Sequence, residues 1–228
     1  SSITGLTTNT TYYIRAYATN SVGTNYGNQI TATTLSQDIK NIVPDYILTI
    51  ISNLGMPMFT GKNPPNLVNF FKVSPYILKS SNISNDVIGS TYGDLTFRLY
   101  DQDNAALSIK MDYVQTTTTG TGMSGFISGS GNDFSVFIKV RSTYSSGYSS
   151  EMIRVISGTM TSTGIKDCYS AIFMVDDFGD PGNNLIEIGQ GRLFYDSDGM
   201  SPIVSSLTSK SIDTVSGIST TLSEVGVK

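Results

Sequence analysis

Two short clusters of acidic residues carry the side chains best suited to hold a metal ion. Asp101 and Asp103 precede Asn104 in the first cluster, and Asp196 and Asp198 form the second. Oxygen-bearing side chains at alternate positions of a loop suit calcium, a hard cation. Neither cluster continues into a calcium-loop consensus, because an alanine follows Asn104 and the second loop has no glutamate at its twelfth place. The sequence predicts no cofactor; a structural calcium ion at these four aspartates and simple solvated turns both stay open.

The chain contains no histidine at all. This absence removes the usual general base, the Ser-His-Asp and Cys-His nucleophile systems and most zinc sites. Cys168 is the single cysteine, so neither an intrachain disulfide nor a CxxC motif can form, and an apolar stretch at 171–175 favours a buried thiol that only packs. A pair of carboxylates could still hydrolyse a glycoside without histidine. We therefore predict no catalytic residues and a protein that is not an enzyme, with a glycoside hydrolase fragment as the lesser alternative.

Two tyrosines offer a candidate ligand-binding site. Tyr144 and Tyr148 lie in the run Thr-Tyr-Ser-Ser-Gly-Tyr-Ser-Ser, where we expect both rings to be exposed. Exposed tyrosines in a Gly/Ser loop suit protein recognition, and they can also stack on sugar rings. Loop structure alone, protein contact and glycan contact all stay open for this pair.

Composition limits the classes of partner. The net charge is −4, charged residues make up only 14% of the chain, and no basic run occurs, which argues against nucleic acid or anionic lipid as the main partner. The abundance of Ser, Thr, Asn and Gly is typical of extracellular β proteins. No segment has about 18 consecutive apolar residues, so an anchor, if there is one, lies outside this chain.

The elements that must position these residues are mostly strands. Leu95, Phe97 and Leu99 alternate with polar residues, as do the apolar residues at 134–140, and this period of two predicts half-buried strands. The short polar loops between strands favour an antiparallel meander. The sequence predicts an all-β fold over 60–204, a β-barrel or β-sandwich of about eight strands at 68–73, 94–100, 107–114, 123–128, 134–140, 152–160, 171–176 and 185–195.

One short helix is expected between the N-terminal segment and this β domain. Pro44 suits a first helical position, Asp45 favours the positive end of the helix dipole, and Gly55 suits a left-handed stop, so the helix should span 44–54. Residues 36–59 are thus predicted to be linker and helix. The Ser/Thr-rich segment 205–228 is predicted to be a C-terminal arm.

The first 35 residues resemble the C-terminal part of a fibronectin type III domain. The resemblance rests on Gly-Leu-Thr-Thr-Asn-Thr-Thr-Tyr-Tyr-Ile-Arg-Ala-Tyr-Ala-Thr-Asn at 5–20, with a final strand at 28–34. It implies a tyrosine corner, in which the Tyr12 hydroxyl bonds to backbone upstream. Since such a sandwich has about seven strands, we expect an upstream portion to be missing; packing of the hairpin on the second domain is the alternative.

The β domain is similar to uncharacterised surface lipoproteins of Bacteroidota. The similarity rests on Gly-Lys-Asn-Pro-Pro-Asn at 61–66, Ile-Ser-Gly-Ser-Gly-Asn-Asp-Phe at 127–134 and Gly-Arg-Leu-Phe-Tyr-Asp-Ser-Asp-Gly at 191–199. It implies a location at the cell surface, associated with the outer membrane or secreted. We expect a non-enzymatic accessory or binding subunit of an envelope assembly, with other envelope proteins or surface glycans as partners. A glycan-binding module of a carbohydrate-uptake system is the alternative.

Overall fold

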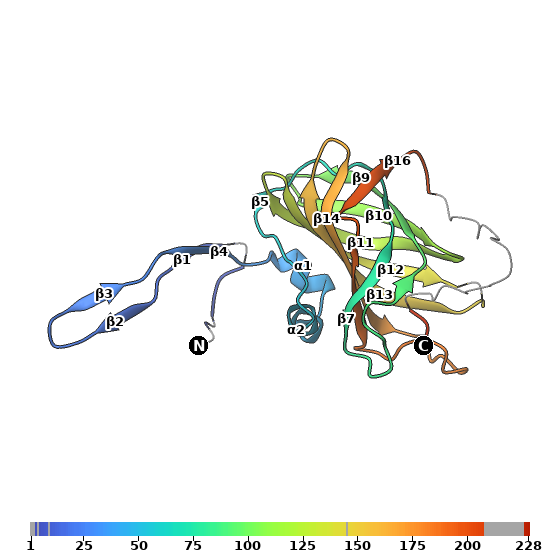
Figure 1. Ribbon diagram of the computed structural model, residues 1–228, viewed down its shortest axis with the longest axis horizontal. Helices are drawn as coiled ribbons and strands as arrows, with labels where there is room; N and C mark the ends of the chain where they lie inside the picture. Colours follow the sequence, from blue (N-terminus) through green and yellow to red (C-terminus); the bar gives the residue numbers. More distant parts are fainter. Residues whose placement is uncertain (1–2, 4, 9, 145, 208–225) are drawn as a thin grey trace.

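The computed structural model describes residues 3, 5–8, 10–144, 146–207 and 226–228. A thin two-stranded ribbon stands at one side of a large β body, with two helices between them (Figure 1). The chain is mostly β, with a large antiparallel sheet and small hairpin sheets, so the predicted fold class is confirmed.

The ribbon comprises two short sheets in succession. β1 (Thr11–Ile14) pairs with β4 (Ile30–Thr33), and further out β2 (Tyr17–Thr19) pairs with β3 (Thr24–Tyr26). The side chain of Asn20 accepts hydrogen bonds from the backbone of Val22 and Gly23, which closes the turn at the tip. Such Asx turns are the reason why Asn favours hairpin tips.

The large sheet contains twelve strands. In chain order they are β5 (Lys62–Asn63), β6 (Asn69–Val73), β7 (Tyr76–Ser81), β8 (Thr91–Tyr92), β9 (Leu95–Asp103), β10 (Ser108–Gln115), β11 (Thr118–Ser130), β12 (Asp133–Thr143), β13 (Ser149–Met160), β14 (Gly164–Asp176), β15 (Gly191–Asp196) and β16 (Met200–Val204).

Three pairs of these strands lie end to end and act as single long strands. β6 and β7 are one pair, β8 and β9 the second, and β15 and β16 the third, because β6 pairs with β9 and β16 while β7 pairs with β8 and β15. The first pair is divided at Pro75, which has no N–H to donate to the ladder. Setting aside the short β5, the wall therefore has eight strands in meander order, which agrees with the predicted number. The predicted ranges miss β7, β8 and β16, and the strand predicted at 185–195 begins only at Gly191.

The sheet closes on itself into a barrel. Each strand from β9 to β14 pairs with its neighbour in sequence, and the last long strand, β15 with β16, pairs back with the first, β6 with β7. Closure satisfies the edges that an open sheet would leave unpaired. It decides between the two predicted architectures in favour of the barrel.

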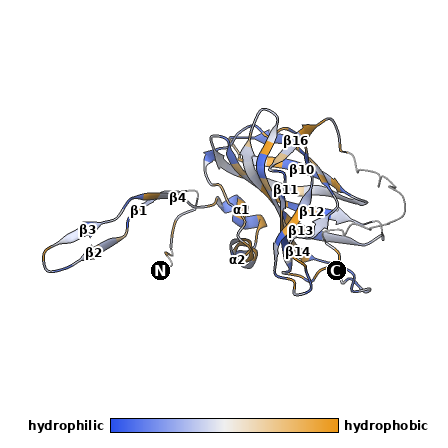
Figure 2. Ribbon diagram, viewed as in Figure 1, coloured by the Kyte–Doolittle hydropathy of each residue, from blue (hydrophilic) through white to orange (hydrophobic). Residues whose placement is uncertain are grey.

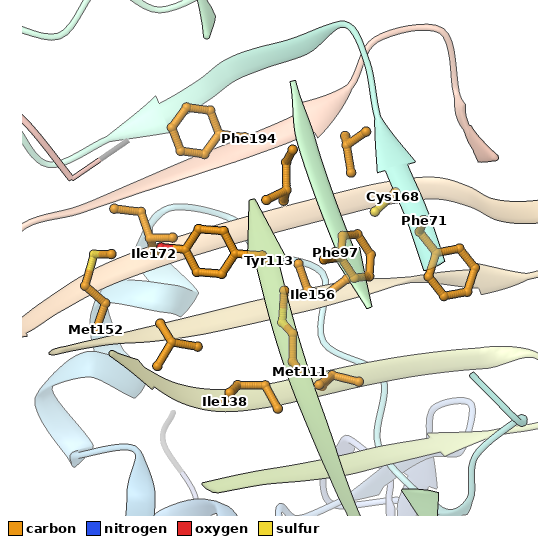
Figure 3. Packing of buried hydrophobic residues seen from close by; sticks show 14 of the residues in the cluster. Phe71, Phe97, Met111, Tyr113, Ile138, Met152, Ile156, Cys168, Ile172 and Phe194 are labelled. Atoms are coloured by element: carbon orange, nitrogen blue, oxygen red, sulfur yellow. The ribbon is translucent and has the colours of Figure 1, made fainter. Parts of the chain in front are cut away.

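The barrel interior is filled with apolar side chains. Alternate residues of each strand point inward, and residues from opposite walls meet in one cluster that includes Phe71, Phe97, Met111 and Phe194 (Figure 3). Cys168 also lies in this cluster, where burial raises the pKa of its thiol to about 12, so the prediction of a buried cysteine is confirmed. A thiol in this state is un-ionised and inert.

Two helices cover part of the outer face of the barrel. α1 (Gln37–Ile42) and α2 (Asp45–Asn53) contribute buried isoleucines to a second cluster, whose barrel side is formed by outward-facing residues such as Phe137, Ile153 and Phe173. Both helices mix hydrophobic and hydrophilic residues, as expected for helices with one buried face (Figure 2). α2 matches the predicted helix at 44–54.

The prediction of only one helix is wrong, because α1 begins within the expected linker. Ser36 caps it by accepting a hydrogen bond from the backbone N–H of Ile39 at 3.3 Å, and Asp38 lies in its first turn. The helix has only six residues, too few to be stable without support. Its stability comes from burial of Ile39 against the barrel, which sequence periodicity over so short a stretch does not reveal.

One end of the barrel is closed by a buried ion pair. Arg192 of β15 donates to both carboxylate oxygens of Asp86 in the loop before β8, at 2.7 Å each, and to the backbone carbonyl of Val227 at 2.9 Å. Val227 in turn forms a bridge with Leu185. Most of the predicted C-terminal arm lies outside the described residues, but residues 226–228 pack at this end.

Candidate binding surfaces

The ribbon carries the corner that the sequence predicts. The hydroxyl of Tyr12 accepts a hydrogen bond from the backbone N–H of Thr7 at 2.7 Å, five residues upstream. The hydroxyl of Thr34 donates to the Thr7 carbonyl at 2.6 Å and ties the last strand to the same corner. These contacts fix the base of the ribbon locally, without help from the barrel.

The base of the ribbon lies beside one rim of the barrel. A shallow depression of about 580 Å³ between them is lined by threonines of β1 and β4, by residues 60–63 and by Ser130. None of the described residues of β1 to β4 belongs to either hydrophobic cluster. The outer part of the ribbon stands clear of the barrel (Figure 1).

One face of the ribbon is apolar and uncovered. Ile14 lies directly opposite Ile30, and Tyr12 directly opposite Ala32, so these four side chains share a face. Ile30 is 61% exposed, whereas Tyr12 and Ile14 are half-buried. Within the described chain, the two strands pair only with each other and leave their outer edges free. A two-stranded ribbon is marginal by itself in water, so this surface has the features of an unfinished sheet.

The predicted exposure of the tyrosine pair is wrong for Tyr144. Its side chain is 3% exposed, packs in the interior cluster and shares a hydrogen bond of 3.0 Å with Ser150. Tyr148 is half-buried and accepts a hydrogen bond from Asn184 at 3.0 Å. The reason is that the alternation of inward and outward residues in β12 extends one residue past its end at Thr143, so Tyr144 is buried as Ser142 is. This pair therefore does not form an exposed platform.

The first aspartate pair terminates strands and caps a turn. Asp101 pairs with Lys110 at 2.9 Å, and Asp103 accepts hydrogen bonds from the backbone of Ala105 and Ala106. Both carboxylates are thus committed within the tight connection between β9 and β10. These contacts are those of a solvated turn.

The second pair lies at the break between β15 and β16. Asp198 accepts a hydrogen bond from the backbone of Met200, whereas Asp196 is buried and accepts from the Ser201 hydroxyl at 2.6 Å and from the backbone of Ser74. Among the residues that the structure describes, no group of three or more His, Cys, Asp or Glu side chains could hold a metal ion. The calcium hypothesis therefore receives no support from this geometry.

The burial of Asp196 makes the stability of the fold depend on pH. Burial raises the pKa of this carboxyl to about 6; the Ser201 hydrogen bond opposes the shift and the neighbouring Asp198 adds to it. Because the folded-state pKa exceeds the unfolded value of about 3.9, the stability contributed by this group is fully present below about pH 4 and is lost as the pH rises through about 6.

Asp196→Asn should therefore melt about 3 °C higher than the wild type at pH 7.5, which corresponds to roughly 1 kcal/mol for a chain of this size. Near pH 4 the two proteins should melt together. Melting curves at a series of pH values test this, with Asp103→Asn as the control in an exposed turn. An effect of Asp196→Asn that is equally large at both pH values would contradict the assignment.

Two rows of aromatic and basic side chains on the outer barrel face were missed by sequence reasoning. The guanidinium of Arg98 lies 4.5 Å from the ring centre of Tyr100 and 5.4 Å from that of Phe70. Elsewhere, Lys79 lies within 5.5 Å of the rings of Tyr169 and Tyr195. The signal was present in the sequence, since residues that alternate with a buried strand face must point outward. These aromatic rings lie on the outer face of the barrel, whereas the ring of Tyr144 is buried.

A basic residue at the centre of the barrel was also missed. Arg154 of β13 is fully buried, and its guanidinium donates a hydrogen bond to the Ser170 hydroxyl. Both faces of β13 are lined by apolar residues, so the alternation along the strand does not show which face Arg154 belongs to.

In the described part of the chain, no helix is long and apolar enough to span a membrane. No protein-family model matches the sequence, and comparisons with curated proteins and with solved structures give no match.

Proposed function

We propose that this chain is a non-enzymatic binding protein of the cell surface or the secreted fraction, and that its N-terminal ribbon docks onto a protein partner in an envelope assembly. The observation that carries the proposal is the apolar face of Ile14 and Ile30 on a ribbon whose edges are free. Edge strands of this kind are templates for pairing with another chain.

The chemistry of the chain supports a binding role over catalysis. The sequence has no histidine, its one cysteine is buried and un-ionised, and the most perturbed carboxyl, that of Asp196, is held beneath the surface by Ser201. Asp196 is only 3% exposed, so a substrate has no access to its carboxyl group. The proposed compartment is supported by the composition and by the resemblance of both parts of the chain to surface proteins.

The partner is expected to supply an apolar sheet face or a strand edge. Further along the ribbon, the exposed rings of Tyr17 and Tyr26 lie opposite each other with their centres 6.2 Å apart and offer additional contact area. Tyrosines of this kind contribute large contact areas at low entropic cost. Net charge near the ribbon is small, since Arg15 is its only charged residue, so the interaction should be insensitive to salt.

Photo-crosslinking in the native envelope tests the proposal. The full-length protein with Tyr26→p-benzoylphenylalanine should yield one dominant protein adduct on illumination, identified by mass spectrometry. Adding Ile14→Thr and Ile30→Thr, which keeps β-branched residues in the strands, should reduce that adduct at least fivefold because the apolar face is lost.

The matched control is Tyr13→Thr, on the opposite face of the same strand, which should leave the adduct unchanged. All variants should melt with the wild type, because neither cluster of the barrel includes these residues. A scatter of low-yield adducts, or equal yields from the double variant and the wild type, would refute docking through the apolar face.

A further inference from the structure

Arg154 lies at the middle of the barrel interior, a place where positive charge is costly. Its neighbours at alternate positions of β13, Met152 and Ile156, belong to the interior cluster, and its cross-strand partners are Ile138 and Ile172 (Figure 3). The side chain is 0% exposed. Arginine remains protonated under all ordinary conditions, so a full charge resides in an apolar core.

The neutral groups around the guanidinium satisfy only part of it. Nη1 donates to the Ser170 hydroxyl at 3.0 Å, and that oxygen also accepts from the Tyr76 hydroxyl at 3.0 Å. The guanidinium carbon lies 4.3 Å from the ring centre of Tyr113. Nε and Nη2 have no hydrogen-bond partner among the described residues.

No anion among the described residues balances this charge. None of their seven ion pairs includes Arg154. Burial raises the pKa of Tyr76 to about 12, against the opposing influence of Arg154, so the phenol next to the guanidinium stays neutral. An isolated buried charge is strongly unfavourable unless it is paired.

The unpaired edge of the Arg154 guanidinium consists of the same two nitrogens with which Arg192 binds a carboxylate in this barrel. Arg192 presents its Nε and Nη2 side by side to the two oxygens of Asp86, at 2.7 Å each. Arg154 leaves the same two nitrogens without a partner among the described residues. Parallel N–H groups on one edge of a guanidinium match a carboxylate in a bidentate arrangement.

We propose that Arg154 is the recognition point of a ligand site inside the barrel, which takes up an organic monocarboxylate with an apolar body. The carboxylate pairs with Nε and Nη2, and the body lies among the surrounding apolar side chains. The interior makes room by movement of methionines, since Met111, Met152 and Met174 all belong to the interior cluster and adapt their shape readily. The site is independent of the ribbon and its partner.

Binding of octanoate to the full-length protein tests the proposal, with octanol as the uncharged match and acetate as the carboxylate without a body. Octanoate should raise the melting temperature of the wild type by several degrees and bind measurably by calorimetry, whereas octanol and acetate should bind at least tenfold more weakly. Equal binding of octanol, or of acetate, would overturn the assignment of an amphiphilic carboxylate.

Arg154→Met distinguishes a ligand site from a buried structural charge. Without ligand the variant should melt at or above the wild-type temperature, because an unpaired charge is replaced by an apolar side chain of similar length. Its affinity for octanoate should fall at least tenfold, while Arg98→Met on the outer face should bind like the wild type. Unchanged affinity in Arg154→Met would refute the site.

A spectroscopic measurement on the wild-type protein keeps the proposal testable if Arg154→Met does not fold. The Nε–H resonance of Arg154, identified in protein labelled with ¹⁵N-arginine by comparison with Arg154→Lys, should shift and sharpen as octanoate is added. A resonance that does not move while octanoate binds would place the ligand elsewhere and refute the proposal.

Discussion

Arg192→Ala is expected to lower the free energy of unfolding by about 3–5 kcal/mol, the cost of leaving one partner of a buried ion pair without the other. The side chains of Arg192 and Asp86 are only 4% and 7% exposed. Removing the guanidinium leaves the Asp86 carboxylate buried without its ion-pair partner, and it removes a hydrogen-bond donor to the Val227 carbonyl. Urea denaturation at pH 7.5 measures the loss of free energy. In a thermal melt the same loss should lower the melting temperature by roughly 10 °C.

Two controls separate pairing from simple truncation. Lys110→Ala removes an exposed pair with Asp101 and should cost less than about 1 kcal/mol. The double variant Asp86→Ala with Arg192→Met should be more stable than Arg192→Ala, because neither partner remains as a buried charge. A loss in Arg192→Ala no larger than that in Lys110→Ala would contradict a closing role for the pair.

The same pair predicts how stability responds to acid. Burial by itself would raise the pKa of Asp86, but the hydrogen bonds from Arg192 and Ser81 outweigh burial and hold the pKa below its ordinary value. The stabilisation is therefore present above the unfolded pKa and is lost as the pH falls through the folded one. This trend opposes that of Asp196, so the two groups are resolved only by comparing their variants.

Gly120→Val should destabilise the barrel by about 3 kcal/mol, the upper part of the range for overpacked cores. A Cβ atom built at this position would lie 1.9 Å from a ring carbon of Tyr113. The ring cannot easily move, since its hydroxyl is bonded to Ser142 at 2.6 Å and its face contacts Arg154. The expected result is a lower urea midpoint with an unchanged slope.

A double-mutant cycle identifies the clash as the cause. In a Tyr113→Leu background, Gly120→Val should cost at least about 1 kcal/mol less than in the wild type, because the two positions are in contact. Gly27→Ala, whose Cβ would meet only ordinary contacts at 3.7 Å, is the control for glycine replacement as such. Additive effects at positions 113 and 120 would show that the ring is not what excludes a side chain at 120.

Alternation and loop length are local properties, and the sequence determined what depends on them: most of the long strands, their meander order and the helix at 44–54. The Tyr12 hydroxyl bond to Thr7 is likewise local, because the residues lie five apart. The buried Cys168 followed from its apolar neighbours.

Tertiary structure alone decided the rest, because the deciding contacts join residues far apart in the chain. Pairing of β6 with β16 and β7 with β15 closes the barrel between the first and last strands of its wall, which no local pattern encodes. The folded barrel buries Tyr144, gives the short α1 a surface to pack on, and surrounds Arg154 with Tyr76, Tyr113 and Ser170. In the sequence an arginine is simply a charge; its burial among neutral groups exists only once three distant strands enclose it.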